Sequence, residues 1–191
     1  MRSFAGLSVL LFALPLAAQT TPSGPTDRGS KLIGGTASVE RTSSEGSTST
    51  SFSVQPTVLF FVANRVAIGG EVGLSYFDHE NGNATSWFIG PAGRLYFGPS
   101  TAKTIPYLGA SVQVGSSSIS SDSPGSSDTD ASAWRIEGLA GLTFMISRQV
   151  GIAGELFVQR DERDFETGTI GEVTSTVTRY GIRFGIAAFI F

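Results

Sequence analysis

Hydrophobic and polar residues alternate with a period of two along most of the chain from residue 31 onward. The segment 132–147 shows this best, because Trp134, Ile136 and Phe144 fall in one phase while Arg135 and Glu137 fall in the other. A period of two is typical of β-strands whose two faces meet different surroundings. The pattern therefore predicts an all-β protein.

The alternating segments predict eight strands. They cover approximately residues 31–40, 49–61, 66–77, 85–97, 105–116, 133–146, 150–160 and 173–191. Short links and longer polar loops follow one another in turn, so antiparallel neighbours place all short links at one end and all long loops at the other. We therefore expect residues 31–191 to form an eight-stranded antiparallel up-and-down β-barrel.

Aromatic residues on the apolar phase lie near both ends of several predicted strands. The pairs are Phe52 and Phe60, Trp87 and Phe97, and Trp134 and Phe144. About ten residues of a tilted strand rise about 23 Å, close to the height of the apolar band of a membrane barrel. We expect the apolar phase to face lipid. The alternative is a soluble, lipocalin-like barrel whose rings fill the core, but the interior of an eight-stranded barrel is narrow and has the other phase to hold.

The opposite phase carries charged residues among small ones. The candidate lumen charges are Glu71, Arg94, Arg135, Glu137, Glu155, Arg179 and Arg183. An arginine at the centre of a lipid-facing surface costs about 2–4 kcal/mol, so these side chains are predicted to point into the lumen and to pair there. Folding each hairpin about its loop predicts the pairs Glu71–Arg94 and Glu155–Arg183. The lumen should be a polar plug rather than an open channel.

Composition excludes several classes of function. Charged residues make up 15% of the chain, the formal net charge is −3, and cysteine is absent. The lack of a basic surplus argues against nucleic-acid binding, and the lack of cysteine excludes disulfides and thiolate zinc sites. Most acidic residues lie toward the long loops and predict an acidic, solvated end: Glu45, Asp78, Glu80, Asp122, Asp128, Asp130, Asp161, Glu162, Asp164, Glu166 and Glu172.

The first 18 residues have the pattern of a secretory signal peptide. Arg2 precedes an apolar stretch from Phe4 to Leu14, and small residues follow at Ala17 and Ala18. This stretch is shorter than the roughly 20 residues of a membrane-spanning helix. We expect export with cleavage of residues 1–18, followed by a flexible, polar segment over residues 19–30.

Candidate catalytic and metal-binding chemistry is sparse. His79 is the single histidine, and with Asp78 or a nearby serine it would suit a base in a lipid-modifying enzyme. A solvated loop histidine is the simpler interpretation, because the turn composition alone explains this segment. Asp122, Asp128 and Asp130 lack the spacing of a calcium loop. We therefore predict no catalytic, cofactor-binding or metal site, and no cofactor.

Two runs, SFSVQPTVLFFVANRVAIGGEVGLSY and WFIGPAGRLYFG, resemble the small eight-stranded outer-membrane β-barrel proteins, the family of OmpX and the OmpA transmembrane domain. The resemblance implies an integral outer-membrane protein that contacts outer-membrane lipids and lipopolysaccharide. It also implies that Phe189 and Phe191 form the carboxyl-terminal signal read by the outer-membrane assembly machinery. It implies no single activity.

We expect a monomer with a structural or surface-interaction role. A lipid A deacylase-like enzyme and a soluble periplasmic lipocalin-like binding barrel are the alternatives.

Two features fit this interpretation poorly. Phe189 and Phe191 share the parity of Arg183, so either a bulge follows Gly185 or the last two rings face inward. Pro56 and Pro91 lie inside predicted strands, where each removes a backbone donor from the sheet. A bulge at each proline is one way to accommodate it.

Overall fold

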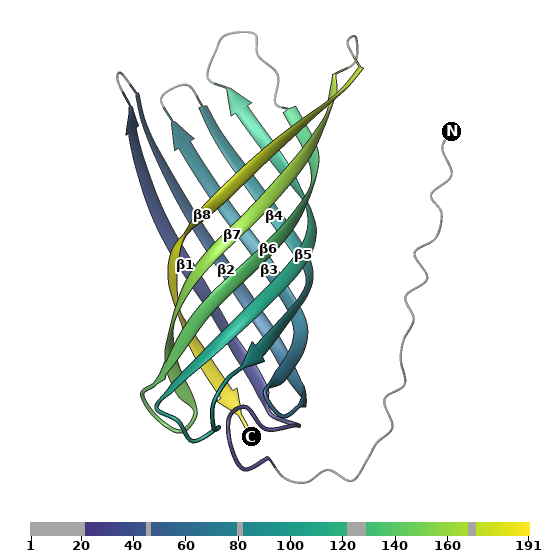
Figure 1. Cartoon of the computed structure of the whole chain (residues 1–191). Helices are drawn as coiled ribbons and strands as arrows, with labels where there is room; N and C mark the ends of the chain where they lie inside the picture. Colours follow the sequence, from purple (N-terminus) through teal and green to yellow (C-terminus); the bar gives the residue numbers. More distant parts are fainter. Residues whose placement is uncertain (1–21, 45–46, 80–81, 122–128, 168–170) are drawn as a thin grey trace, which may run out of the picture.

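A computed structural model describes residues 22–44, 47–79, 82–121, 129–167 and 171–191. Its strands are β1 (Lys31–Ser44), β2 (Ser47–Ala63), β3 (Val66–His79), β4 (Gly82–Tyr96), β5 (Thr104–Ser121), β6 (Thr129–Met145), β7 (Val150–Thr167) and β8 (Gly171–Ile190). Each strand pairs with its antiparallel neighbour, and β1 pairs with β8 to close the barrel (Figure 1). The predicted eight-stranded up-and-down barrel is confirmed. Within the described residues, no helix is long and apolar enough to cross a membrane.

Several strands extend further toward the long loops than the hydrophobic pattern predicts. β7 runs to Thr167 and β5 to Ser121, because backbone pairing continues after the apolar residues have ended. This extension moves Asp161 into the wall of the barrel, where its side chain is fully buried. Counting Asp161 among the solvated acidic loop residues was therefore wrong.

The outer face of the barrel is apolar and the inner face carries the charges. On β6, Ile136, Leu142 and Phe144 are about half exposed, whereas Arg135 and Glu137 are buried. The aromatic residues Phe52, Phe60, Trp87 and Phe97 are likewise exposed on the outside. A lipocalin-like barrel with these rings in its core is therefore excluded.

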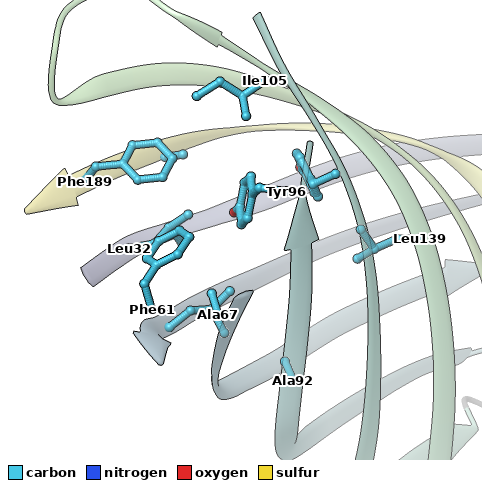
Figure 2. Close-up of a cluster of buried hydrophobic side chains, with 11 residues drawn as sticks. Leu32, Phe61, Ala67, Ala92, Tyr96, Ile105, Leu139 and Phe189 are labelled. Carbon is cyan, nitrogen blue, oxygen red and sulfur yellow. The ribbon is translucent and has the colours of Figure 1, made fainter. Parts of the chain in front are cut away.

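The interior at the short-turn end is filled by an apolar cluster (Figure 2). Its larger members are Leu32, Leu59, Phe61, Tyr96, Ile105, Tyr107, Leu139 and Phe189. The ring of Tyr96 lies 5.3 Å from that of Phe61 and 5.1 Å from that of Tyr107, between centroids. The interior is thus closed partly by packed rings and partly by polar groups, whereas the sequence indicated polar groups alone.

Residues 22–30 lie across the same end of the barrel. The Gly29 amide donates to the Phe61 carbonyl at 2.9 Å, and the Arg65 amide donates to the Thr26 carbonyl at 2.7 Å. Thr26 and Ser30 are both 1% exposed. The described part of the expected flexible segment 19–30 is therefore packed against the β2–β3 turn. Residues 19–21 and the expected signal peptide, 1–18, lie outside the described residues.

The last strand keeps its register to the end of the sheet. Pairing of β8 with β1 runs without a shift from Lys31↔Ile190 to Ala37↔Phe184. Phe189 consequently points inward and is 1% exposed, while Phe191 is partly buried against the apolar cluster. Of the two alternatives for the terminal rings, the inward orientation is correct and the bulge is not.

Neither Pro56 nor Pro91 produces a bulge. On either side of Pro56, the β2–β3 pairs Val54↔Leu74 and Thr57↔Glu71 keep one register. The same holds for Ile89↔Val114 and Ala92↔Ser111 around Pro91. On this side of the strand, the backbone pairs next to each proline are missing, and the pairing then continues in the same register. Neither proline is therefore accommodated by a bulge.

The barrel wall is incomplete between β1 and β8 toward the long loops. Their pairing stops at Ala37↔Phe184, although β1 pairs with β2 up to Ser44↔Ser47 and β8 pairs with β7 up to Thr167↔Gly171. Beyond this point the two strands diverge in Figure 1. Within the described chain, residues 38–44 and 171–183 are paired on one side only. We refer to this opening as the β1–β8 seam.

Replacing Phe189 with alanine should strongly destabilise the barrel, because it leaves a void in the apolar cluster. We expect a loss of about 3–5 kcal/mol, measured by urea unfolding in detergent. Ile190→Ala is the matched control, since its side chain lies on the outer face, is 51% exposed and leaves no internal void. Equal losses for the two variants would contradict the inward placement of Phe189.

Candidate functional site in the barrel lumen

Arg183 on β8 is the centre of a buried ionic network. Its Nη2 and Nη1 donate to Oε1 and Oε2 of Glu137 at 2.6 and 2.8 Å, and its Nε donates to Oε2 of Glu155 at 2.6 Å. The register places Glu155 directly opposite Arg183, which is the pair expected from the sequence. All three side chains are at most 5% exposed. Two carboxylates therefore share one guanidinium.

Glu155 has two further donors. Its Oε1 lies 3.0 Å from Nη2 of Arg94 and accepts a hydrogen bond from the Tyr107 hydroxyl at 2.6 Å. The Tyr107 ring lies over Gly141, where a Cβ atom would come within 2.4 Å of the ring. A glycine at 141 is thus required for Tyr107 to reach Glu155.

The predicted pair Glu71–Arg94 does not form. The β3–β4 hairpin closes at His79↔Gly82, so its centre lies earlier than the loop composition indicated. Arg94 then stands opposite Ala67, and Glu71 stands opposite Gly90. Arg94 instead extends across the lumen to Glu155 on β7.

Glu71 is held by neutral donors. Its carboxylate accepts from Gln55 Nε2 at 2.5 Å, Gln113 Nε2 at 2.7 Å and Thr57 Oγ1 at 3.1 Å. Among the described residues, no lysine or arginine forms an ion pair with it. Gln55 also accepts a hydrogen bond from Arg183, which links Glu71 to the centre of the network. Hydrogen bonds to a charged acceptor are the stronger kind, so this arrangement offsets part of the cost of burial.

A second ionic group lies nearer the long loops. Arg135 donates through Nε and Nη2 to both carboxylate oxygens of Asp161, at 2.7 and 3.1 Å. Its guanidinium also lies 3.8 Å from the centroid of the Phe88 ring. Arg179, whose side chain is 40% exposed, approaches Asp161 more loosely at 3.8 Å. The seven predicted lumen charges thus fall into two groups, with Glu71 joined to the first by Gln55.

Sequence reasoning missed several members of the network. Asp161 lay beyond the predicted end of β7, although it has the parity of Glu155. Gln55, Gln113 and Tyr107 also have the lumen parity of their strands, so extending the parity rule to neutral polar residues would have found them. Selecting lumen residues by their charge alone therefore left out the neutral polar members of the network.

A cavity of about 550 Å³ lies inside the long-loop end of the barrel. The hydroxyl-bearing residues Ser51, Ser75 and Ser86 form part of its wall, opposite Arg163 on β7 and Arg179 on β8. We call it the upper cavity. Two arginine side chains, Arg163 and Arg179, border this open space.

The residues considered for catalysis or metal binding lie at the long-loop end. His79 ends β3, opposite Gly82 and Ser49, and its side chain lies outside the described residues. Asp122 and Asp128 also lie outside them, as does the side chain of Asp130. In the described part of the chain, no group of three or more His, Asp or Glu side chains is placed to hold a metal ion.

No family model and no curated protein matches this chain. Solved structures that are similar to it include two outer-membrane proteins. Neisserial surface protein A has 16% sequence identity and a TM-score of 0.55, with 84% of this chain and 96% of that protein covered. Outer Membrane Protein W from E. coli has 16% identity and a TM-score of 0.52, with 86% and 99% covered. These likenesses confirm the fold of the small outer-membrane barrels.

Replacing Arg183 with methionine should destabilise the folded barrel by about 3–5 kcal/mol, because it leaves Glu137 without a cation and removes one of the two that hold Glu155. Urea unfolding in detergent provides the measurement. Arg179→Met is the matched control on the same face of β8. Its partly exposed ion pair should contribute less than about 1 kcal/mol.

The double variant Glu137→Gln/Arg183→Met should recover part of this loss, since the buried carboxylate and its cation are removed together. Coupling near zero between the two substitutions would contradict the central position of Arg183.

Proposed function

We propose that this chain is an integral outer-membrane β-barrel protein with a structural or surface-interaction role and no catalytic activity. The observation that supports this best is the reversed polarity of the barrel, with hydrophobic side chains outside and ion pairs inside. Soluble monomers rarely expose apolar patches larger than a few hundred Å². A bilayer covers such a surface, and the closed sheet pairs the backbone groups that lipid cannot satisfy.

The height of the apolar surface supports this location. On the outer face of β8, Ile190, Ile186, Phe184, Ile182 and Tyr180 are exposed, and the next outward residues are exposed threonines at 178, 176 and 174. The apolar run covers about ten residues, which at the usual tilt span about 23 Å, close to the apolar band of membrane barrels. The short turns and the carboxyl terminus then face the periplasm, and the acidic long loops face outward.

The filled interior supports a scaffold rather than a pore. The apolar cluster closes the short-turn end, and the Arg183 network fills the lumen above it. A barrel of this strand number has an interior that side chains can fill. In this proposal the rigid wall displays the acidic loops to surface partners.

The proposal includes the steps that bring the chain to the membrane. Residues 1–18 direct export and are removed, and Phe189 with Phe191 forms the signal read by the assembly machinery. The finished barrel is a monomer surrounded by outer-membrane lipids and lipopolysaccharide.

Fractionation of the native cell envelope tests the location, and electrophoresis tests the closed sheet. We expect the chain in the outer-membrane fraction and a mobility in mild SDS that changes on boiling, because a closed sheet resists detergent unfolding. In planar bilayers the purified protein should give no steady ion conductance.

A periplasmic, membrane-free location would overturn the proposal. Stable conductance would overturn only the proposal that the lumen is plugged, because fractionation tests the location separately.

A further inference from the structure

The upper cavity has the chemistry of an anion site. Two guanidinium groups, those of Arg163 and Arg179, lie on its β7 and β8 side. The side chains of Ser51, Ser75 and Ser86, from the opposite strands β2, β3 and β4, supply hydroxyl groups. A guanidinium presents several N–H donors in a planar fork that suits phosphate, and serine hydroxyls donate to the same oxygens.

Among the described side chains around Arg163, guanidinium groups outnumber carboxylates. Arg163 interacts electrostatically with Arg179, Arg135 and Asp161, so a single carboxylate faces three guanidinium groups. Both oxygens of that carboxylate already accept hydrogen bonds from Arg135. Among the described residues, Arg163 takes part in no ion pair. Among the described side chains, the region therefore holds fewer carboxylates than guanidinium groups.

Arg163 also carries a donor without an acceptor. Its Nε is buried and has no hydrogen-bond partner. Buried donors in folded proteins are nearly always satisfied, and an unsatisfied one requires an explanation. An anion in the adjoining cavity would supply both the acceptor and the missing negative charge.

The β1–β8 seam gives this region a lateral opening. A smaller hollow next to the upper cavity is bordered by Ser38 on β1, Tyr180 on β8 and Arg179. Ser38 and Tyr180 both lie beyond the last β1–β8 pair, Ala37↔Phe184. The seam is therefore the place where the head of a lipid molecule would enter, whereas a soluble molecule would enter from the long-loop end.

We propose that the upper cavity binds a phosphomonoester group through Arg163 and Arg179. A phosphomonoester carries nearly two negative charges at neutral pH and three acceptor oxygens, which match the two guanidinium groups and the surrounding hydroxyls. The group belongs either to a soluble molecule or to a lipid head that enters at the seam. The site itself is the same in both cases.

Nitrogen-15 NMR of the full-length mature barrel in a phosphate-free amine-oxide detergent tests this directly. The probes are inorganic phosphate for a soluble source and phosphatidic acid, mixed into the micelle, for a lipid source. We expect a saturable shift of the Arg163 Nε–Hε resonance with at least one probe. Arg179→Gln, followed through the same resonance, should weaken binding about 10-fold, as expected for the loss of one charge-assisted hydrogen bond. Arg163→Gln, followed through the Arg179 Nε–Hε resonance, should weaken it by a similar factor.

Arg160→Gln is the matched control, because Arg160 lies on β7 but faces outward and is exposed. Binding by this variant should be unchanged. A shift with phosphate alone identifies a soluble ligand, and a shift with phosphatidic acid alone identifies a lipid head. The proposal is overturned if neither probe gives a saturable shift, or if Arg179→Gln, folded by its SDS mobility, binds as tightly as the unsubstituted protein.

Discussion

The structure depends on one constraint: a charged side chain on the apolar outer wall would be costly, so the charges of these strands must be paired inside the barrel. Arg183 shows how this is achieved. It forms ion pairs with both Glu137 and Glu155 and donates to Gln55, which in turn donates to Glu71. Strands distant in sequence are thereby joined across the lumen by side chains, in addition to the backbone pairing of neighbours. A buried charge is tolerated only with such partners, so the network is expected to act as a unit in which single substitutions are not additive.

The interior changes in character along the barrel axis. Packed rings fill the short-turn end, the hydrogen-bonded ionic network of Arg183 occupies the middle, and the upper cavity with its two arginines lies toward the long loops. The β1–β8 pairing follows the same division, since it is complete beside the rings and absent beside the cavity. The end with β1–β8 pairing is therefore filled by side chains, whereas the end that carries the long loops holds the upper cavity.

The alternation of hydrophobic and polar residues predicted the number of strands and the inward or outward direction of most side chains. This prediction succeeds because the face on which a residue lies depends on odd or even position within a strand and not on where the strand ends. Register was less predictable. Glu155–Arg183 followed from the position of one loop, whereas Glu71–Arg94 failed because the β3–β4 turn is tighter than its polar composition indicates. Strand ends were underestimated because backbone pairing does not require hydrophobic residues, which hid Asp161. The inward turn of Phe189 was left as one of two alternatives, since parity alone does not exclude a bulge.

Quenching of tryptophan fluorescence by brominated lipids tests the reversed polarity most directly. The chain has two tryptophans, Trp87 and Trp134; Trp87 is 49% exposed on the outer face, and Trp134 is half-buried in the apolar phase of β6. In vesicles of dibrominated phosphatidylcholine, the account predicts strong quenching relative to unbrominated vesicles, with little quenching by aqueous iodide. Efficient quenching by iodide together with no effect of the brominated lipid would contradict a lipid-facing exterior.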